Sequence, residues 1–386
     1  METVAPKLIV SLWEQILWSN NMKLIAKRVR WTFMAVATQA IVSTPVLAAD
    51  LKFGETAVEQ LEYISRNLAG RSIGTEKEKE AVDYLTQELE SFGYEPNLQP
   101  FTFERNGQTF NSVNIIAESK GKSGRQIIVG AHYDSAPSSS TLDRSNLQGP
   151  NDNASGVGVL LELADRLETD TNNTVKFILF GAEEVGLIGS EYYASNMSED
   201  EVKNTIVMVN LDSLIVGDKM YFHAGRSAAT NPTLGQFRDL ALDIAQDLGI
   251  PAETNPGLNP EYPKGTGCCS DLESFDNLVP VLAVEATNWD IGDLDGYVQT
   301  TNPNVPGGAT WHDPATDNLE FINETFPGLI EERTRNYTLI LDTFLDRVNS
   351  QPVAIPEPSS ILGTTFVGLG LLIKLNFRKL KKNKKT

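Results

Sequence analysis

The sequence predicts one α/β domain in which a mixed, mostly parallel β-sheet lies between two layers of helices. Two observations predict this fold class. Short apolar runs typical of buried strands alternate along the chain with longer segments of helical apolar spacing. Residues 50–350 also contain no Pro-, Gly- or Ser-rich linker that would divide them. Strands that alternate with helices give a sheet covered on both faces, which makes a three-layer sandwich.

The expected elements follow in order along this segment. Residues 76–92 have helical apolar spacing, with Ala81, Leu85 and Leu89 on one side. Buried strands are expected over 126–132, 175–180, 205–211 and 279–285. Further helices are expected over 157–167, through 192–193 and over 326–348. The polar segment 135–150 and the Pro- and Gly-rich segment 251–267 are expected loops, and we expect them to form walls of a cleft.

Residues 1–49 have the pattern of an export signal. Lys23, Lys27 and two arginines form a basic region, residues 31–47 are apolar or small, and residues 46–49 offer a cleavage site. Met22 is a plausible true start, because it gives a leader of ordinary length. The alternative is an amphipathic first helix of the domain. We therefore expect the domain that follows, residues 50–350, to be exported.

Residues 351–386 form a second targeting segment. Pro356-Glu357-Pro358 precedes an apolar run over 361–373, which is shorter than the ~20 residues of a comfortable membrane span. A basic end follows, which should stay cytoplasmic. This pattern resembles the PEP-CTERM sorting tail of Gram-negative bacteria, and the resemblance implies an exosortase-type membrane enzyme as partner. A plain short anchor is the alternative. Either way, the protein would end in the periplasm, on the membrane or at the cell surface.

The net charge excludes one class of partner. The chain carries a formal charge of −19. Subtracting the +3 of residues 1–49 and the +6 of residues 356–386 leaves −28 for the segment between them. A segment with this much negative charge repels phosphate backbones, and we therefore do not expect nucleic acid to bind. It attracts cationic peptides weakly, with strong screening by salt.

The only cysteines are Cys268 and Cys269. Adjacent Cα atoms lie about 3.8 Å apart across a trans peptide, below the usual disulfide range, so a bond between them would be strained. No disulfide framework holds this chain together, and its stability must come from its core. Whether the two thiols are free or joined stays open at this point.

Five short stretches supply an ordered set of metal-type ligands at strand ends or in adjacent loops. They span 130–134, 151–156, 181–184, 210–213 and 311–313. Two of the three histidines of the chain fall in this set. Open α/β sheets place their chemistry at such strand ends, and two His with several carboxylates suit a pair of hydrolytic metal ions. The candidates are His132, Asp134, Asp152, Glu183, Glu184, Asp212 and His312.

Each of these residues alone has a plainer explanation. His132 alone suits a packed core histidine, and Asp152 alone suits a helix N-cap. Glu183 and Glu184 alone suit a solvated helix start, where carboxylates complement the helix dipole. All five stretches together favour the metal site. The alternation of side chains along a strand places His132 and Asp134 on one face, so the Asp134 carboxylate can accept the second ring N–H.

These motifs resemble those of the co-catalytic di-zinc aminopeptidases, over roughly residues 55–348. The resemblance implies the three-layer sandwich of zinc peptidases and two Zn²⁺ ions, although Mn²⁺ and Co²⁺ suit the same ligands. It assigns His132 and Asp212 to one ion, Glu184 and His312 to the other, and Asp152 to both. It implies that Asp134 supports His132. It also implies that Glu183 is the general base for a bridging water that attacks the bond after the first residue of a peptide.

Longer runs indicate a narrower group within this family. They span 255–259, 262–269, 284–289, 295–297 and 311–313. A relative in that group trims basic N-terminal residues, which implies a preference for Arg or Lys. Asp290, Asp293 and Asp295 are candidates to hold such a side chain, although a turn-rich surface loop explains them equally well. Many relatives have His after the Ser-Asp pair that is Ser270-Asp271 here, where this chain has Leu272.

Rival functions remain at this stage. A carboxypeptidase, or a glutaminyl-cyclase-like acyltransferase with one zinc, uses the same scaffold. A non-catalytic surface binding protein is a third reading, from a different class. The substrate expected under the leading reading is the N-terminus of a peptide or protein. About two zinc ions per chain would favour the enzyme, and none would favour the binding protein.

Overall fold

The computed structural model describes residues 53–167, 170–289, 304–308 and 310–350. The expected export signal over 1–49 and the expected tail over 351–386 lie outside the described residues, as do Asp290, Asp293 and Asp295. Among the helices of the described part, none is long and apolar enough to span a membrane.

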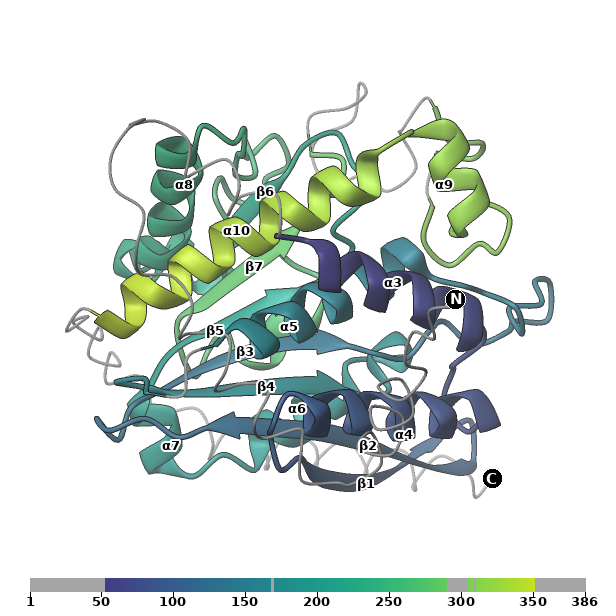
Figure 1. Cartoon of the computed structure of the whole chain (residues 1–386), viewed down its shortest axis with the longest axis horizontal. Coiled ribbons are helices and arrows are strands. Elements are labelled where there is room, and N and C mark those ends of the chain that lie inside the picture. Colours follow the sequence, from purple (N-terminus) through teal and green to yellow (C-terminus); the bar gives the residue numbers. More distant parts are fainter. Residues whose placement is uncertain (1–52, 168–169, 290–303, 309, 351–386) are drawn as a thin grey trace, which may run out of the picture. The chain divides into compact units, whose positions relative to one another are not determined.

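In the described residues, seven strands form one mixed sheet in the order β1-β2-β4-β3-β5-β7-β6 (Figure 1). Their bounds are β1 Asn97–Arg105, β2 Gln108–Ser119, β3 Gln126–His132, β4 Thr174–Phe180, β5 Thr205–Leu211, β6 Tyr221–Ala224 and β7 Val281–Glu285. The four central strands β4, β3, β5 and β7 are parallel to one another. Strands β1, β2 and β6 pair antiparallel. The mixed, mostly parallel sheet predicted from the sequence is confirmed.

Helices cover both faces of this sheet. On one face the core joins the strands to α3 Glu55–Asn67, α4 Glu76–Ser91, α5 Ser155–Arg166, α8 Gln236–Leu248 and α10 Leu329–Ser350. On the other face it joins them to α6 Ile188–Ser195 and α7 Glu199–Asn204. Side chains alternate accordingly along β3: Ile127 and Val129 belong to the first core and Ile128 to the second. This is the predicted three-layer sandwich.

Helices α3 and α5 approach each other unusually closely. A Cβ built at Gly158 of α5 would lie 2.5 Å from the carbonyl oxygen of Ala57 in α3, so only glycine fits there. The carboxylate of Glu162, also on α5, accepts hydrogen bonds from the amides of Gly54 and Ala57, both at 2.9 Å. It therefore caps the N-terminus of α3, where Gly54 has no side chain to offer.

The structure also contains elements that the sequence reasoning did not predict. They are α3, the β1–β2 hairpin, α7, β6, α8 and α9 Leu319–Thr325. The hairpin turns at Asn106-Gly107, where both residues have positive φ angles of 52° and 77°. The predicted loops over 135–150 and 251–267 are irregular, apart from isolated bridges at Glu253 and Thr266.

Candidate metal centre

The carboxyl ends of the parallel strands carry most of the candidate ligands. His132 ends β3, Asp212 follows the last residue of β5, and Glu183 and Glu184 lie shortly after β4. Asp152 lies in the turn Pro150–Ala154 that leads into α5, where its own φ of −116° and ψ of 97° are not helical. Because parallel strands end at the same edge of a sheet, residues distant in sequence meet there.

Two groups of three side chains form at this edge and share Asp152. In the first, Nε2 of His132 lies 3.3 Å from Oδ1 of Asp152 and 3.5 Å from Oδ1 of Asp212. In the second, Nε2 of His312 lies 3.1 Å from Oδ2 of Asp152 and 2.8 Å from Oε2 of Glu184. Each oxygen of Asp152 therefore faces a different group, which is the arrangement of a carboxylate that bridges two cations.

Glu183 and Asp134 lie beside these groups without joining either one. Oε2 of Glu183 is 3.9 Å from Nε2 of His132. The carboxylate of Asp134 accepts hydrogen bonds from the amides of Glu183 at 3.0 Å and Glu184 at 3.3 Å, and so orients that turn. Nδ1 of His132 lies 3.2 Å from the backbone oxygen of Asp134 and 3.7 Å from its Oδ1. The backbone oxygen is thus the nearer partner of the ring, which alternation along the strand did not predict.

Buried polar side chains fix the turn that carries Asp152. The side chain of Asn153 donates to the carbonyl of Leu211 at 2.9 Å, next to Asp212. The carboxylate of Asp317 accepts the backbone amides of Asn151 at 2.9 Å and Asp152 at 3.2 Å. Sequence reasoning missed Asp317, because it lies in the irregular stretch after His312 with no motif of its own.

The two histidines and their acidic neighbours perturb one another's protonation. Burial lowers the pKa of His132, but Glu183 and Asp212 outweigh burial and hold that pKa well above its usual value. Burial acts likewise on His312, where contacts with Asp152 and Glu184 outweigh it and raise the pKa to about 11. Burial tends to raise the pKa of Asp152, but the two imidazoles hold it below its usual range.

The pKa values of Glu183 and Glu184 shift upwards, in contrast to that of Asp152. Burial, with Asp152 as a further cause, raises the pKa of Glu184 to about 7. Burial also raises the pKa of Glu183 well above its usual value, although His132 opposes this. Several buried carboxyl groups thus share this edge of the sheet, and bound divalent cations would favour their charged forms.

The donor set fits zinc. Each group combines one imidazole nitrogen with carboxylate oxygens, the ligands of catalytic zinc sites. Oε1 of Glu184 is buried and has no hydrogen-bond partner among the described residues, as expected of an oxygen that a cation would satisfy. His132 and Asp212 would hold one ion, Glu184 and His312 the other, and Asp152 both.

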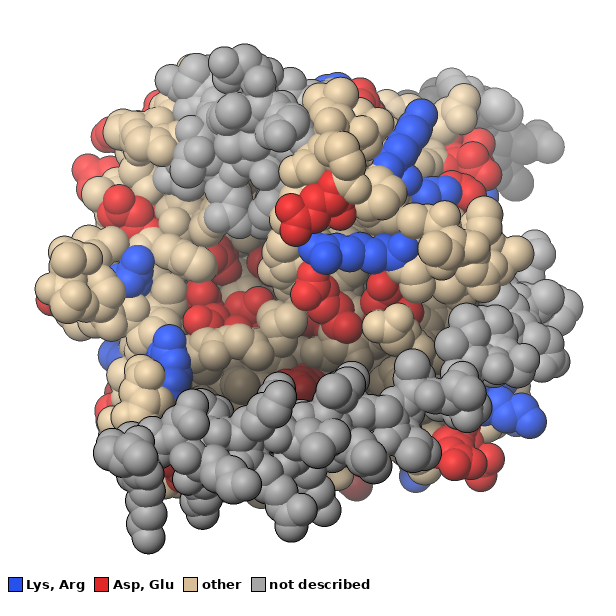
Figure 2. All heavy atoms as spheres, turned by 180° about the vertical axis from the view of Figure 1, so that it is seen from behind, with Lys and Arg blue, Asp and Glu red and all other residues tan. Residues whose placement is uncertain are grey.

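A cleft of about 300 Å³ opens over these groups. The charged side chains that line it are mostly Asp and Glu. Figure 2, which views the molecule from the side opposite to Figure 1, shows a hollow lined with Asp and Glu. Beyond the ligands, its lining includes Glu183, Ser213, Cys268, Cys269, Glu285, Thr287 and Trp311. The loops over 135–150 and 251–267 contribute no residue to this lining, so the expectation that they wall the cleft is wrong. The residues that follow each loop supply the wall instead.

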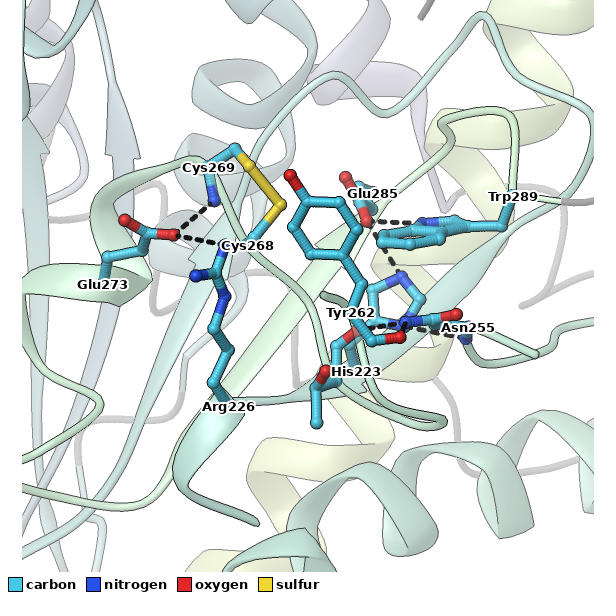
Figure 3. The surroundings of a disulfide bond; sticks show 10 residues. His223, Arg226, Asn255, Tyr262, Cys268, Cys269, Glu273, Glu285 and Trp289 are labelled. Carbon is cyan, nitrogen blue, oxygen red and sulfur yellow. Dashed lines mark hydrogen bonds and ion pairs between the residues drawn. A yellow bond between two sulfur atoms is a disulfide. The ribbon is translucent and has the colours of Figure 1, made fainter. Parts of the chain in front are cut away.

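Cys268 and Cys269 form a disulfide between adjacent residues at the rim of this cleft (Figure 3). Cys269 has a positive φ of 67°, and its amide donates to Glu273 at 3.0 Å. The structure thus gives an answer to the question that the sequence left open. Although Cys268, Cys269 and Glu273 lie close enough to suggest a third metal group, both sulfurs are bonded to each other and offer no thiolate.

The sandwich fold and the paired ligand groups define a metal-dependent hydrolase. The model of peptidase family M28 matches residues 114–338. The chain is 42% identical to the alkaline phosphatase isozyme conversion protein of Escherichia coli strain K12, over 77% of this chain and 91% of that relative. It is 38% identical to aminopeptidase YwaD of Bacillus subtilis, over 40% of this chain and 32% of that relative. The chain belongs to peptidase family M28, so it is a hydrolase of peptide bonds, and its paired ligand groups suit zinc.

Solved structures share the fold. An aminopeptidase from Aneurinibacillus sp. strain AM-1 aligns with a TM-score of 0.56 at 20% identity, covering 78% of this chain and 97% of that one. BSAP, a zinc aminopeptidase from Bacillus subtilis, aligns with a TM-score of 0.59 at 16% identity, covering 77% of this chain and 95% of that one. The glutaminyl cyclase of Porphyromonas gingivalis aligns with a TM-score of 0.57 at 21% identity, covering 77% of this chain and 99% of that one. The scaffold alone therefore does not separate peptidase from cyclase.

Proposed function

We propose that this protein is an aminopeptidase that releases N-terminal residues, preferably Arg or Lys, from peptides. One observation carries the proposal: two ligand groups share Asp152, and Glu183 lies beside them in the same cleft. The similarity to aminopeptidase YwaD supports the aminopeptidase assignment. The acidic lining of the cleft supports a preference for cationic substrates.

Two zinc ions in these groups would lower the pKa of a water and polarise the scissile carbonyl. The protein's own residues then move the proton. Glu183 takes the proton of the attacking water and later gives it to the leaving amine. Burial suits Glu183 to this exchange, because it raises the pKa of the carboxyl towards that of the groups with which it trades a proton. Asp134, through the amides of Glu183 and Glu184, holds both side chains in place.

The test is a panel of aminoacyl amides with free and N-acetylated amines, assayed with the zinc-loaded protein. We expect hydrolysis only of the free-amine substrates. Glu183→Ala should lower kcat by roughly 100-fold or more while two zinc ions stay bound. Glu191→Ala, which removes an exposed carboxylate on α6, is the matched control and should keep full activity. Hydrolysis of acetylated substrates, or an active Glu183→Ala variant, would contradict the proposal.

Glutaminyl cyclisation is the second candidate, because several solved cyclases share the fold. The second ligand group weighs against it, since one metal ion suffices for the cyclase that the sequence resemblance suggested. A peptide with N-terminal glutamine distinguishes the two functions. Ring closure loses ammonia and leaves the peptide otherwise intact, whereas an aminopeptidase shortens the peptide by one residue. A carboxypeptidase would shorten it from the other end.

We further propose that the protein is exported and that residues 351–386 are a sorting or anchoring tail. The basic and apolar pattern of residues 23–47 supports export, and the Pro-Glu-Pro motif before an apolar run supports the tail. Mass spectrometry of the protein recovered from cell fractions would reveal both mature ends. A chain found in the cytoplasm with residues 22–49 still attached would contradict export.

A further inference from the structure

Glu285 is an acidic side chain of the cleft that neither metal group uses. It ends β7, the strand next to β5, which leads into Asp212. Its relative exposure is 9%, and it lines the same cleft as the two ligand groups. A carboxylate buried at a cleft wall costs free energy unless something compensates its charge.

Two buried rings hold the Glu285 carboxylate in place (Figure 3). Nε1 of Trp289 donates a hydrogen bond to Oε1 at 2.9 Å. Nε2 of His223, on the neighbouring strand β6, lies 2.8 Å from the same oxygen. Both His223 and Trp289 are at most 1% exposed. The carboxylate is therefore preorganised, because its partners have little freedom to move.

The backbone around His223 places a donor against one of its two ring nitrogens. The backbone amide of Asn255 donates to Nδ1 at 3.0 Å, so Nδ1 presents its lone pair there. The other ring nitrogen, Nε2, lies 2.8 Å from Oε1 of Glu285 without meeting hydrogen-bond geometry. The indole of Trp289 therefore supplies the hydrogen bond that orients the carboxylate, and the imidazole of His223 lies beside the same oxygen.

No Lys or Arg side chain among the described residues of the cleft pairs with this carboxylate. None of the described residues that line the cleft is Lys or Arg. Both contacts above fall on Oε1, and among the described residues no donor is hydrogen-bonded to Oε2. The guanidinium of Arg226, near the disulfide, contacts other groups. Its Nη2 lies 3.5 Å from Oε1 of Glu273, and its Cζ lies 5.1 Å from the ring centroid of Tyr262. Glu285 therefore presents Oε2 in the cleft without a hydrogen-bond partner among the described residues.

We propose that Glu285 is the residue that selects a cationic first residue, by pairing with the guanidinium or ammonium group of its side chain. The inference rests on the proposed aminopeptidase function and names the residue behind its substrate preference. A charged donor against a fixed, largely buried carboxylate gives a strong hydrogen bond. The Cys268–Cys269 disulfide lines the same cleft and offers an apolar wall for the methylene stem of Arg or Lys.

A competing role must be separated from this one. Glu285 could instead bind the free α-amine, which every aminopeptidase substrate carries. Loss of that contact would lower activity on all substrates by the same factor. Selection of the side chain predicts a different pattern, in which the preference for Arg over Leu falls.

The test compares kcat/KM for Arg, Lys and Leu amides in the zinc-loaded wild type, Glu285→Gln and Glu273→Gln. Glutamine keeps the shape of the side chain and removes its charge. We expect the Arg-to-Leu ratio to fall roughly 10- to 100-fold in Glu285→Gln. Glu273→Gln removes an equal charge on the other side of the disulfide, outside the cleft lining, and should keep the wild-type ratio. An unchanged ratio in Glu285→Gln, or an equal loss on all three amides, would overturn the proposal.

A binding measurement makes the result independent of turnover and of folding defects. Calorimetric titration with argininamide and leucinamide is done in the Glu183→Ala background, in which turnover is lost, and adding Glu285→Gln should show the same loss of preference there. Glu285→Asp keeps the charge and should retain more preference for argininamide than Glu285→Gln does. Equal preference in the two variants would overturn the proposal. A wild type that hydrolyses no free-amine substrate contradicts the proposed function, whereas turnover with an unaltered ratio contradicts only the role of Glu285.

Discussion

Asp152 presents one oxygen to each ligand group, so its orientation decides whether both groups are complete. That orientation depends on the backbone of its turn, which Asp317 holds through two amide hydrogen bonds. Burial raises the pKa of Asp317 well above its usual value, while these amides oppose that shift. Asp317 is thus a positioning residue that acts on the metal site through Asp152.

Asp317→Ala should weaken zinc binding by about 10- to 100-fold, because support of a metal ligand is lost. Competition against a chromophoric chelator measures this change. Asp143→Ala is the matched control, since it removes an exposed carboxylate that also accepts a backbone amide, from Ser145 at 2.9 Å. Equal zinc affinity in the wild type and the Asp317→Ala variant would refute the positioning role.

The ligand candidates could be identified from the sequence, because each lies at a strand end or in an adjacent loop with a motif around it. Glu285 and Asp317 could not be assigned roles in this way. Glu285 ends a strand that is otherwise apolar. Its role depends on a contact with His223, which lies 62 positions earlier in the sequence. The candidates Asp290, Asp293 and Asp295 lie outside the described residues, so their role stays a prediction.

At the scale of elements, α3 depends on α5 for its first turn. The N-terminal amides of a helix need acceptors, and the N-cap residue of α3, Gly54, has no side chain to supply one. Glu162 fills this need from α5 while also accepting Nε of Arg166 at 2.8 Å. The same two helices touch closely at Gly158, so capping and packing reinforce one another.

Glu162→Ala should destabilise the fold by about 2–4 kcal/mol, because two buried amides lose their acceptor. Urea unfolding followed by circular dichroism measures the change. Glu162→Gln keeps one acceptor oxygen and should lose less. A Glu162→Ala variant as stable as the wild type would show that the amides find another acceptor.

The strands of the central sheet could be predicted because each is a short, continuous apolar run between polar segments. The β1–β2 hairpin was missed, because β1 is largely polar and exposed and β2 mixes buried apolar residues, such as Ile115 and Ala117, with polar ones. The Asn106-Gly107 pair was nevertheless a usable signal, since this dipeptide favours the positive φ angles of a tight hairpin turn. Helices α3 and α8 were missed although both have an apolar face, as their buried residues show.

At the scale of the whole molecule, an acidic body surrounds a site built to hold cations. His312, with a pKa of about 11, holds a proton at neutral pH in the metal-free protein, and Glu184, with a pKa of about 7, holds one part of the time. Both must release their protons to become ligands. Metal binding is therefore coupled to pH.

Apparent zinc affinity should rise with pH, by about tenfold per pH unit for each proton released. Titrations between about pH 6 and 8, repeated in buffers of different ionisation enthalpy, would count the protons. Removal of zinc by a chelator should also lower the melting temperature, because the ions bind only the folded state. An affinity that does not change with pH would mean that the metal-free ligands already lack their protons.

The disulfide at the rim of the cleft differs from an ordinary structural cross-link in what it does to the unfolded ensemble. A cross-link stabilises a fold mainly by closing a loop in the unfolded chain, and the effect grows with loop length. Cys268 and Cys269 are neighbours in sequence, so their bond closes almost no loop and removes little disorder from that ensemble. A reductant would therefore leave global stability nearly unchanged and act instead on the local shape of one pocket wall.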